Sequence, residues 1–236
     1  NNYNGKTIGS AFRTIEYALT QIPDSSTLKV LAGNYTLDNP VTVPCNVGIV
    51  GDSLRTVTVR AGNPTLDMFW VNNGSYLAHI TFKDHEAPSA AVAFNPDGSA
   101  GEIFQSPYVQ NCTSITTTGT GMRVDGRHSE GLKSMVVDAF TQYNQGGIGI
   151  HMLYLGNTQL VSVFTICCET AILCEEGGFC SLTNSNSSFG VLGLKASGVS
   201  QTKYTGTVAQ SISDPTFGGT TISVSYTHLT LPTIYS

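Results

Sequence analysis

The stretch YLAHITF, residues 76–82, recurs four more times along the chain in altered form. The later copies are YVQNCTS, MVVDAFT, QLVSVFT and SLTNSNS, which start at residues 108, 135, 159 and 181. In each copy the second residue is Leu or Val, the fourth is polar, and the fifth is small or aliphatic. The starts are 32, 27, 24 and 22 residues apart. This pattern predicts one supersecondary unit that repeats with insertions of variable length.

A second set of apolar segments lies between these copies. Its members are MFWV (68–71), AVAF (91–94), GMRV (121–124), GIGIHML (147–153), TAILCE (170–175) and VLGLKA (191–196). One repeat contains two strands in roughly 22 to 30 residues, which is too short for a propeller blade of about 40 residues. No helical pattern separates the strands. We therefore expect an all-β protein whose residues 23–205 form a single right-handed parallel β-helix, since parallel crossovers are right-handed.

The chain has one convincing helical segment, residues 11–22, which precedes the first strands and is stopped by Pro23. Its apolar residues fall on one helical face: Phe12, Ile15, Ala18, Leu19 and Ile22. The end of a solenoid exposes apolar interior and unpaired strand backbone. We therefore expect residues 1–22 to form an entry loop and a short capping α-helix.

The repeat fades after residue 205, so we expect residues 206–223 to be a C-terminal segment outside the regular stack. The stretch VSYTHLTLPT, residues 224–233, matches one reading frame of a commonly used transposase sequencing adapter. We expect residues 224–236 to be an artefact of that origin and exclude them from the fold.

The composition is poor in charge. Only 11% of the residues are charged, against a usual ~25%, and the net charge is −5. Nucleic-acid binding needs clustered Lys and Arg, which the chain lacks, so we expect no nucleic-acid partner. No stretch approaches the ~18 apolar residues of a membrane span, so we expect no membrane insertion.

The spacing of the six cysteines fits no zinc site. Cys112 occupies an inward position of the repeat, where a small thiol packs well. We expect buried free thiols in a protein that folds in a reducing cytosol, with a disulfide between Cys174 and Cys180 as the alternative. We expect neither a metal nor a cofactor.

The densest ionisable cluster lies in residues 122–131 and contains Asp125, Arg127, His128 and Glu130. An acid, a base and an anion binder on one loop are the parts needed to hydrolyse or lyse a polysaccharide. A solvated turn is the simpler interpretation, because Asp-Gly is a turn signal. The sequence leaves open whether Glu130 faces Asp125 or Asp97. A second charged loop, residues 83–86, is a weaker candidate for a catalytic or sugar-binding site.

Trp70 and Asp97 are the candidate ligand-binding residues. Trp70 could stack on a sugar if it points outward, but we expect core packing. The polar fourth column of the repeat contains His79, Asn111, Asp138, Ser162 and Asn184. We interpret this column as a structural ladder of hydrogen-bonded corners. A dyad of His79 and Asp138, two rungs apart, would span roughly 10 Å, too far for direct proton transfer.

Several segments resemble known families. FRTIEYAL (12–19), LKVLAGNYTL (28–37) and IVGDS (49–53) resemble the N-terminal cap and first rungs of the pectin-lyase-like right-handed parallel β-helix superfamily. The run from residue 12 to about residue 204 resembles virion structural proteins of marine tailed phages with T4-like particles. The segments that carry this second resemblance include FWVNNGSYLAHITF, VAFNPDGSAG, SPYVQNCTSITTTGTGMRVDG, TQYNQGGIGIH and CSLTNSNSSFG.

The resemblance implies a part of a phage tail, similar to a tail fibre or tailspike. We expect a non-enzymatic virion protein that folds in the host cytoplasm, forms a homotrimer along the helix axis, and binds a host-surface glycan or other tail proteins. The alternative is a tailspike depolymerase, a polysaccharide hydrolase or lyase, that uses residues 125–130. Polygalacturonate lyases of this fold hold calcium with several Asp residues, and no such Asp-rich run exists here.

Overall fold

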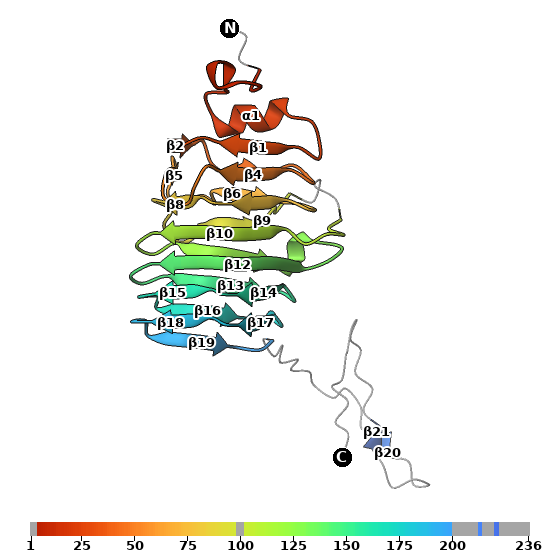
Figure 1. Cartoon of the computed structure of the whole chain (residues 1–236). Coiled ribbons are helices and arrows are strands. Elements are labelled where there is room, and N and C mark those ends of the chain that lie inside the picture. Colours follow the sequence, from red (N-terminus) through yellow and green to blue (C-terminus); the bar gives the residue numbers. More distant parts are fainter. Residues whose placement is uncertain (1–3, 98–101, 200–211, 214–219, 222–236) are drawn as a thin grey trace. The chain divides into compact units, whose positions relative to one another are not determined.

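The computed structural model describes residues 4–97, 102–199, 212–213 and 220–221. It divides into two units, residues 1–199 and 200–236. The first unit is mostly β, with parallel strands in two sheets and one α-helix (Figure 1). In the second unit β20 (Ile212–Ser213) pairs antiparallel with β21 (Thr220–Thr221). The rest of segments 206–223 and 224–236 lies outside the described residues.

The larger sheet of the first unit has twelve parallel strands in two adjacent rows. The first row is β1 (Thr27–Val30), β4 (Gly48–Gly51), β7 (Tyr76–Ala78), β10 (Tyr108–Ile115), β12 (Ser134–Tyr143), β14 (Asn157–Val161) and β17 (Phe179–Thr183). The second row is β2 (Gly33–Leu37), β5 (Val57–Ala61), β8 (Thr81–Lys83), the later halves of β10 and β12, β15 (Phe164–Ile166) and β18 (Asn186–Ser188). Each pass of the chain therefore adds a strand beside the previous one.

The smaller sheet has seven parallel strands, which confirm the second set of apolar segments. They are β3 (Val41–Thr42), β6 (Phe69–Val71), β9 (Ala90–Phe94), β11 (Thr120–Asp125), β13 (Ile148–Leu153), β16 (Thr170–Cys174) and β19 (Leu192–Ala196). The strands of both sheets stack along one direction, with the helix next to β1 (Figure 1).

The strand register corrects the repeat at one point. Tyr76 pairs with Tyr108 as predicted, but Tyr108 pairs with Val136 and not with residue 135. Asp138 therefore lies beside Gln110, and Ala139 occupies the fourth column. The predicted alignment of Asp138 with Asn111 was wrong, because adjacent valines make the sequence pattern ambiguous. In the structure Val137 and Phe140 are the inward residues, and both are fully buried.

The fourth column is a row of left-handed corners between the two rows of strands. Its members and their φ angles are His79 (60°), Asn111 (49°), Ala139 (50°), Ser162 (53°) and Asn184 (48°). Asn111 Nδ2 donates to His79 Nδ1 at 2.7 Å, and Asn184 Nδ2 donates to Ser162 Oγ at 3.4 Å. Short polar side chains tolerate positive φ, which explains why four of the five positions are polar.

This corner geometry predicts that Ala139→Asn stabilises the protein. Alanine pays a steric penalty at positive φ that asparagine partly avoids, so we expect the free energy of unfolding to rise by about 0.5–1 kcal/mol. Urea denaturation measures the change. Ala139→Val is the matched control and should destabilise, because β-branched residues resist this conformation. A loss of stability in the asparagine variant would contradict the register.

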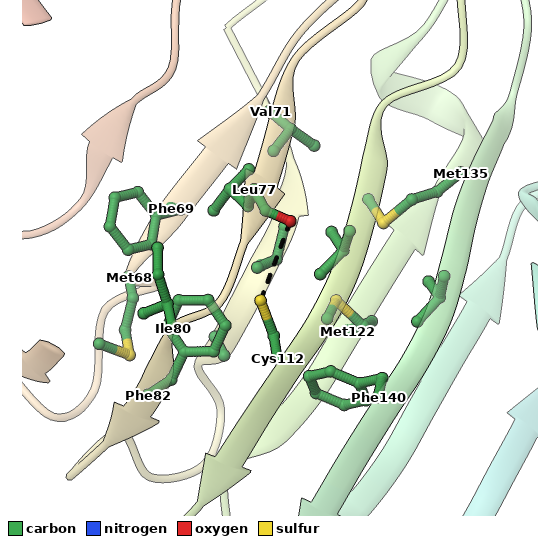
Figure 2. Packing of buried hydrophobic residues seen from close by; sticks show 14 of the residues in the cluster. Met68, Phe69, Val71, Leu77, Ile80, Phe82, Cys112, Met122, Met135 and Phe140 are labelled. Atoms are coloured by element: carbon green, nitrogen blue, oxygen red, sulfur yellow. Dashed lines mark hydrogen bonds between the residues drawn. The ribbon is translucent and has the colours of Figure 1, made fainter. Parts of the chain in front are cut away.

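One apolar core runs through the interior between the sheets. In Figure 2, Met68, Phe69, Ile80 and Phe82 group with Cys112, Met122 and Phe140 from later strands. Cys112 is fully buried, which confirms its predicted inward position, and burial raises the pKa of its thiol to about 12. None of the six cysteines forms a disulfide, including Cys174 and Cys180, whose thiols lie close enough to interact.

The capping helix α1 (Ile15–Gln21) is shorter than the predicted residues 11–22. It begins at Ile15 because Thr14 is the N-cap, and Thr14 Oγ1 accepts a hydrogen bond from Tyr17 N at 3.2 Å. Ile15 and Leu19 join the core, whereas Phe12 precedes the helix. Within the described residues, none of the helices is long and apolar enough to span a bilayer.

Candidate functional site

The outer face of the seven-stranded sheet presents a row of polar and aromatic side chains. Trp70 pairs in register with Ala93, Ala93 with Arg123, and Arg123 with His151. Phe69 and Val71 flank Trp70 on β6 and are both fully buried, so Trp70 faces outward and is partly exposed. The expected core packing of Trp70 was wrong, because its two neighbours fill the interior.

Asp67 fixes the two largest side chains of this face. Asp67 Oδ2 accepts from Trp70 Nε1 at 2.9 Å and from Arg123 Nη2 at 2.5 Å. Its other oxygen accepts from Ala90 N at 2.8 Å. Arg123 Nη1 also donates to Pro88 O at 3.0 Å. Charge-assisted bonds of this kind are strong, so the indole and the guanidinium are held in one arrangement.

His151 continues the row one strand further along. Its Nε2 donates to Glu175 Oε2 at 2.9 Å, and Ser197 Oγ donates to Glu175 Oε1 at 3.3 Å. His151 points away from the buried core, but its side chain is only 15% exposed. Burial lowers the pKa of His151, although Glu175 opposes the change. A neutral imidazole beside Arg123 can exchange hydrogen bonds with a ligand.

We define Trp70, Asp67, Arg123, His151 and Glu175 as the Trp70 face. Its members come from segments far apart in the chain, and the register of the sheet brings them together. The face offers an aromatic ring, nitrogen donors and carboxylate acceptors.

The predicted Asp125 loop lies at the end of β11. Asp125 is buried and caps the short 3-10 helix η3 (Gly126–His128), accepting from Arg127 N at 3.0 Å and from Arg127 Nη2 at 2.6 Å. His128 Nε2 lies 3.4 Å from Asp125 Oδ2. Burial alone would raise the pKa of Asp125, but the hydrogen bonds from Arg127 outweigh it and lower the pKa. Asp125 is therefore an ionised structural cap and a poor proton donor.

The predicted site also contains Arg127, Glu130 and Asp97. Arg127 stacks on Tyr154, with the guanidinium carbon 3.7 Å from the ring centroid. Glu130 is exposed, and among the described residues no ion pair joins it to Asp125. Asp97 is also exposed, three residues beyond β9, and its N–H donates to Asn95 Oδ1 at 2.9 Å. Within the same part of the chain, no group of His, Cys, Asp or Glu is arranged to hold a metal ion.

The loop of residues 83–86 is not simply solvated. His85 is fully buried, and its Nε2 lies 3.2 Å from both Thr120 O and Ser114 Oγ. Burial lowers the pKa of His85 to about 4. Glu86 accepts from Thr118 N at 2.6 Å and from Thr118 Oγ1 at 2.7 Å. These contacts give the loop a structural role that its charged sequence does not indicate.

The chain is similar to a solved structure of a viral protein. This viral protein is the ORF18 protein of Geobacillus virus E2, with 11% sequence identity and a TM-score of 0.37. The match covers 79% of this chain and 58% of that protein, so it spans less than two thirds of the viral protein. No protein-family model matches the chain. No curated protein matches it either.

Proposed function

We propose that this chain is a non-enzymatic structural protein of a phage virion, similar to a tail fibre or tailspike, and that its Trp70 face binds a host-surface glycan. The first unit is, in this proposal, a single right-handed parallel β-helix. Two features support that fold: every described strand pair of the first unit is parallel, and each row of strands follows the chain order without a break. The sequence resemblance to phage virion proteins supports the location.

The observation that carries glycan binding is the fixed outward orientation of Trp70. The apolar face of a sugar ring packs against an indole, while sugar hydroxyls need both donors and acceptors. Arg123 supplies nitrogen donors next to the ring, and Asp67, Glu175 and the second ring nitrogen of His151 supply acceptors. Because these groups are already held by each other, binding would cost little side-chain ordering.

The ion pairs favour binding over cleavage. Glycoside hydrolysis needs one carboxyl that keeps its proton and a second about 5 to 9.5 Å away. Asp67 is paired with Arg123, Asp125 with Arg127, and Glu175 with His151. The hydrogen bonds from Arg127 lower the pKa of Asp125, so this carboxylate is ionised and cannot act as the acid. Release of reducing ends from host polysaccharide would support the alternative, a depolymerase.

Trp70→Ala is expected to weaken glycan binding about tenfold, a change of ~1.4 kcal/mol. Purified host surface polysaccharide, immobilised on a biosensor, provides the measurement. Tyr17→Ala is the matched control, because Tyr17 is an exposed aromatic residue on the capping helix, outside the Trp70 face. Equal binding by the wild type and the Trp70 variant would exclude this face as the glycan site.

We further propose that the protein forms a homotrimer along the stacking axis, folds in the host cytoplasm, and resides in the phage tail. Light scattering of the purified protein should give three times the chain mass of 25.0 kDa. Gold-labelled antibodies against the protein should decorate tails of the intact virion. A monomeric mass would overturn the trimer, and labelling confined to capsids would overturn the location.

A further inference from the structure

A groove of about 550 Å³ lies at the N-terminal end of the first unit. Residues 4–8, the capping helix α1 and strand β1 line it. Hydrogen bonds fold the 4–10 segment on itself, with Gly5 N donating to Ser10 O and Ser10 Oγ to Asn4 Oδ1, each at 2.8 Å. The segment therefore forms a self-contained wall of the groove.

The floor of the groove contains a strand edge. Strand β1 pairs with β4 on one side, and within the described residues no strand pairs with its other side. Gly48 N donates to Ser26 O at 3.0 Å, and Asp52 N donates to Val30 O at 2.8 Å. Since backbone groups alternate in direction along a strand, the N–H and C=O groups of Thr27 and Lys29 point to the free edge. They are positioned to receive another strand.

The apolar side chain of β1 is also less covered than its counterparts in the stack. Leu28 pairs in register with Ile49, which pairs with Leu77. Ile49 and Leu77 are fully buried, whereas Leu28 is only partly buried and lines the groove. The capping helix therefore leaves part of Leu28 uncovered. A side chain from an added strand would bury Leu28 further.

The charges of the groove select its occupant. Lys6 and Lys29 line it, and its described lining residues include no Asp or Glu. Lys29 Nζ already pairs with Asp52 Oδ1 at 3.0 Å. Lys6 is therefore the lysine of the groove that is more available to a carboxylate of the ligand. An extended peptide with alternating apolar side chains and a carboxylate matches the strand edge, the apolar lining and this charge.

We propose that the groove binds an extended, acidic, apolar segment of a partner protein as an additional β-strand beside β1. The proposal concerns a docking site at the end of the stack and is independent of the Trp70 face. The peptide backbone supplies affinity through Thr27 and Lys29, and its alternate side chains enter the groove next to Leu28. Lys6 pairs with the carboxylate.

The test uses the full chain and a fluorescent probe peptide of about seven residues that alternates valine with threonine and ends in glutamate. We expect saturable binding by fluorescence anisotropy and slower hydrogen exchange of the Thr27 and Lys29 amides. A probe with its alternate backbone amides methylated should bind about tenfold more weakly, because it cannot complete the ladder. Equal binding of both probes, or unchanged exchange at Thr27 and Lys29, would overturn the proposal.

Two variants of one residue separate the strand edge from the charge. Lys29→Pro removes the outward N–H, and proline is tolerated on the open side of an edge strand. Lys29→Ala retains that N–H but also loses the pair with Asp52, so it is the matched control. We expect about tenfold weaker binding for the proline variant than for the alanine variant, with similar unfolding midpoints. Equal affinities of the two variants would contradict the proposal. A dimer mass in light scattering, with the second copy occupying the groove, would also contradict it.

Discussion

Phe140→Ala is expected to lower the free energy of unfolding by about 3–5 kcal/mol, the usual effect of emptying a fully buried aromatic site. Phe140 is 0% exposed and pairs in register with Cys112, in the middle of the continuous core. Its neighbours belong to stacked strands on either side, so the cavity cannot close without moving several strands. Urea denaturation followed by circular dichroism measures the loss.

The matched control for this variant is Phe104→Ala. Phe104 is the same residue type but is 72% exposed, so its replacement should change stability by less than about 0.5 kcal/mol. The comparison tests the corrected register, because the sequence pattern alone assigned residue 139 to the inward column. Similar losses in the two variants would show that Phe140 does not face the interior.

Acidification from pH 7 to pH 4 is expected to remove about 3 kcal/mol of stability through His85. Burial lowers the pKa of His85 to about 4 in the folded protein, against 6.5 for the ordinary side chain. Between these two values the unfolded chain binds a proton and the folded protein does not. Protonation therefore favours unfolding, and the loss grows as the pH falls from about 6.5 to 4.

His85→Gln isolates this effect, because glutamine keeps a polar side chain but does not titrate. The variant can be less stable at pH 7, but its free energy of unfolding should vary less with pH between 6.5 and 4.5. Asp125 and Glu86 have lowered pKa values, so their contributions are present at higher pH and are lost only as the pH falls through the carboxyl range. An unchanged slope in the glutamine variant would contradict the assignment to His85.

The arrangement of strands could be predicted because the apolar pattern has the period of a strand. The segments of both sets correspond to strands in two sheets, and four of the five aligned copies have the predicted register. The third copy was displaced by one residue, because Val136 and Val137 fit the pattern equally well. Only packing distinguishes them, since Val137 and Phe140 are both buried.

The candidate site was less accessible from the sequence. Asp67 is an isolated acid in the sequence, and its bond to Arg123 joins residues 56 positions apart. That contact depends on the register of the smaller sheet. A usable signal was nevertheless present: Trp70, Arg123 and His151 occupy equivalent places in FWV, MRV and IHM. When these segments are aligned on the apolar residues around the central position, all three residues fall in one row, as the strand register places them.

Two further differences have local causes. The helix begins at Ile15, because Thr14 is the N-cap and accepts a hydrogen bond from a backbone N–H of the first turn. This capping signal lies inside the segment whose apolar pattern predicts a helix. His85 lies between charged residues, which indicate a solvated loop. Its ring nevertheless contacts Ser114 and Thr120. Hydrogen bonds to a neighbouring strand, which the local sequence does not reveal, decide its position.

The central claim, that the Trp70 face binds host glycan without cutting it, is tested most directly by the size of the bound polysaccharide. Intact host polysaccharide is incubated with the protein, recovered from the complex, and compared with untreated polysaccharide by size-exclusion chromatography. We predict retention that depends on Trp70 and an unchanged length distribution. Shortened chains with new reducing ends, or retention that is unaffected by Trp70→Ala, would contradict the account.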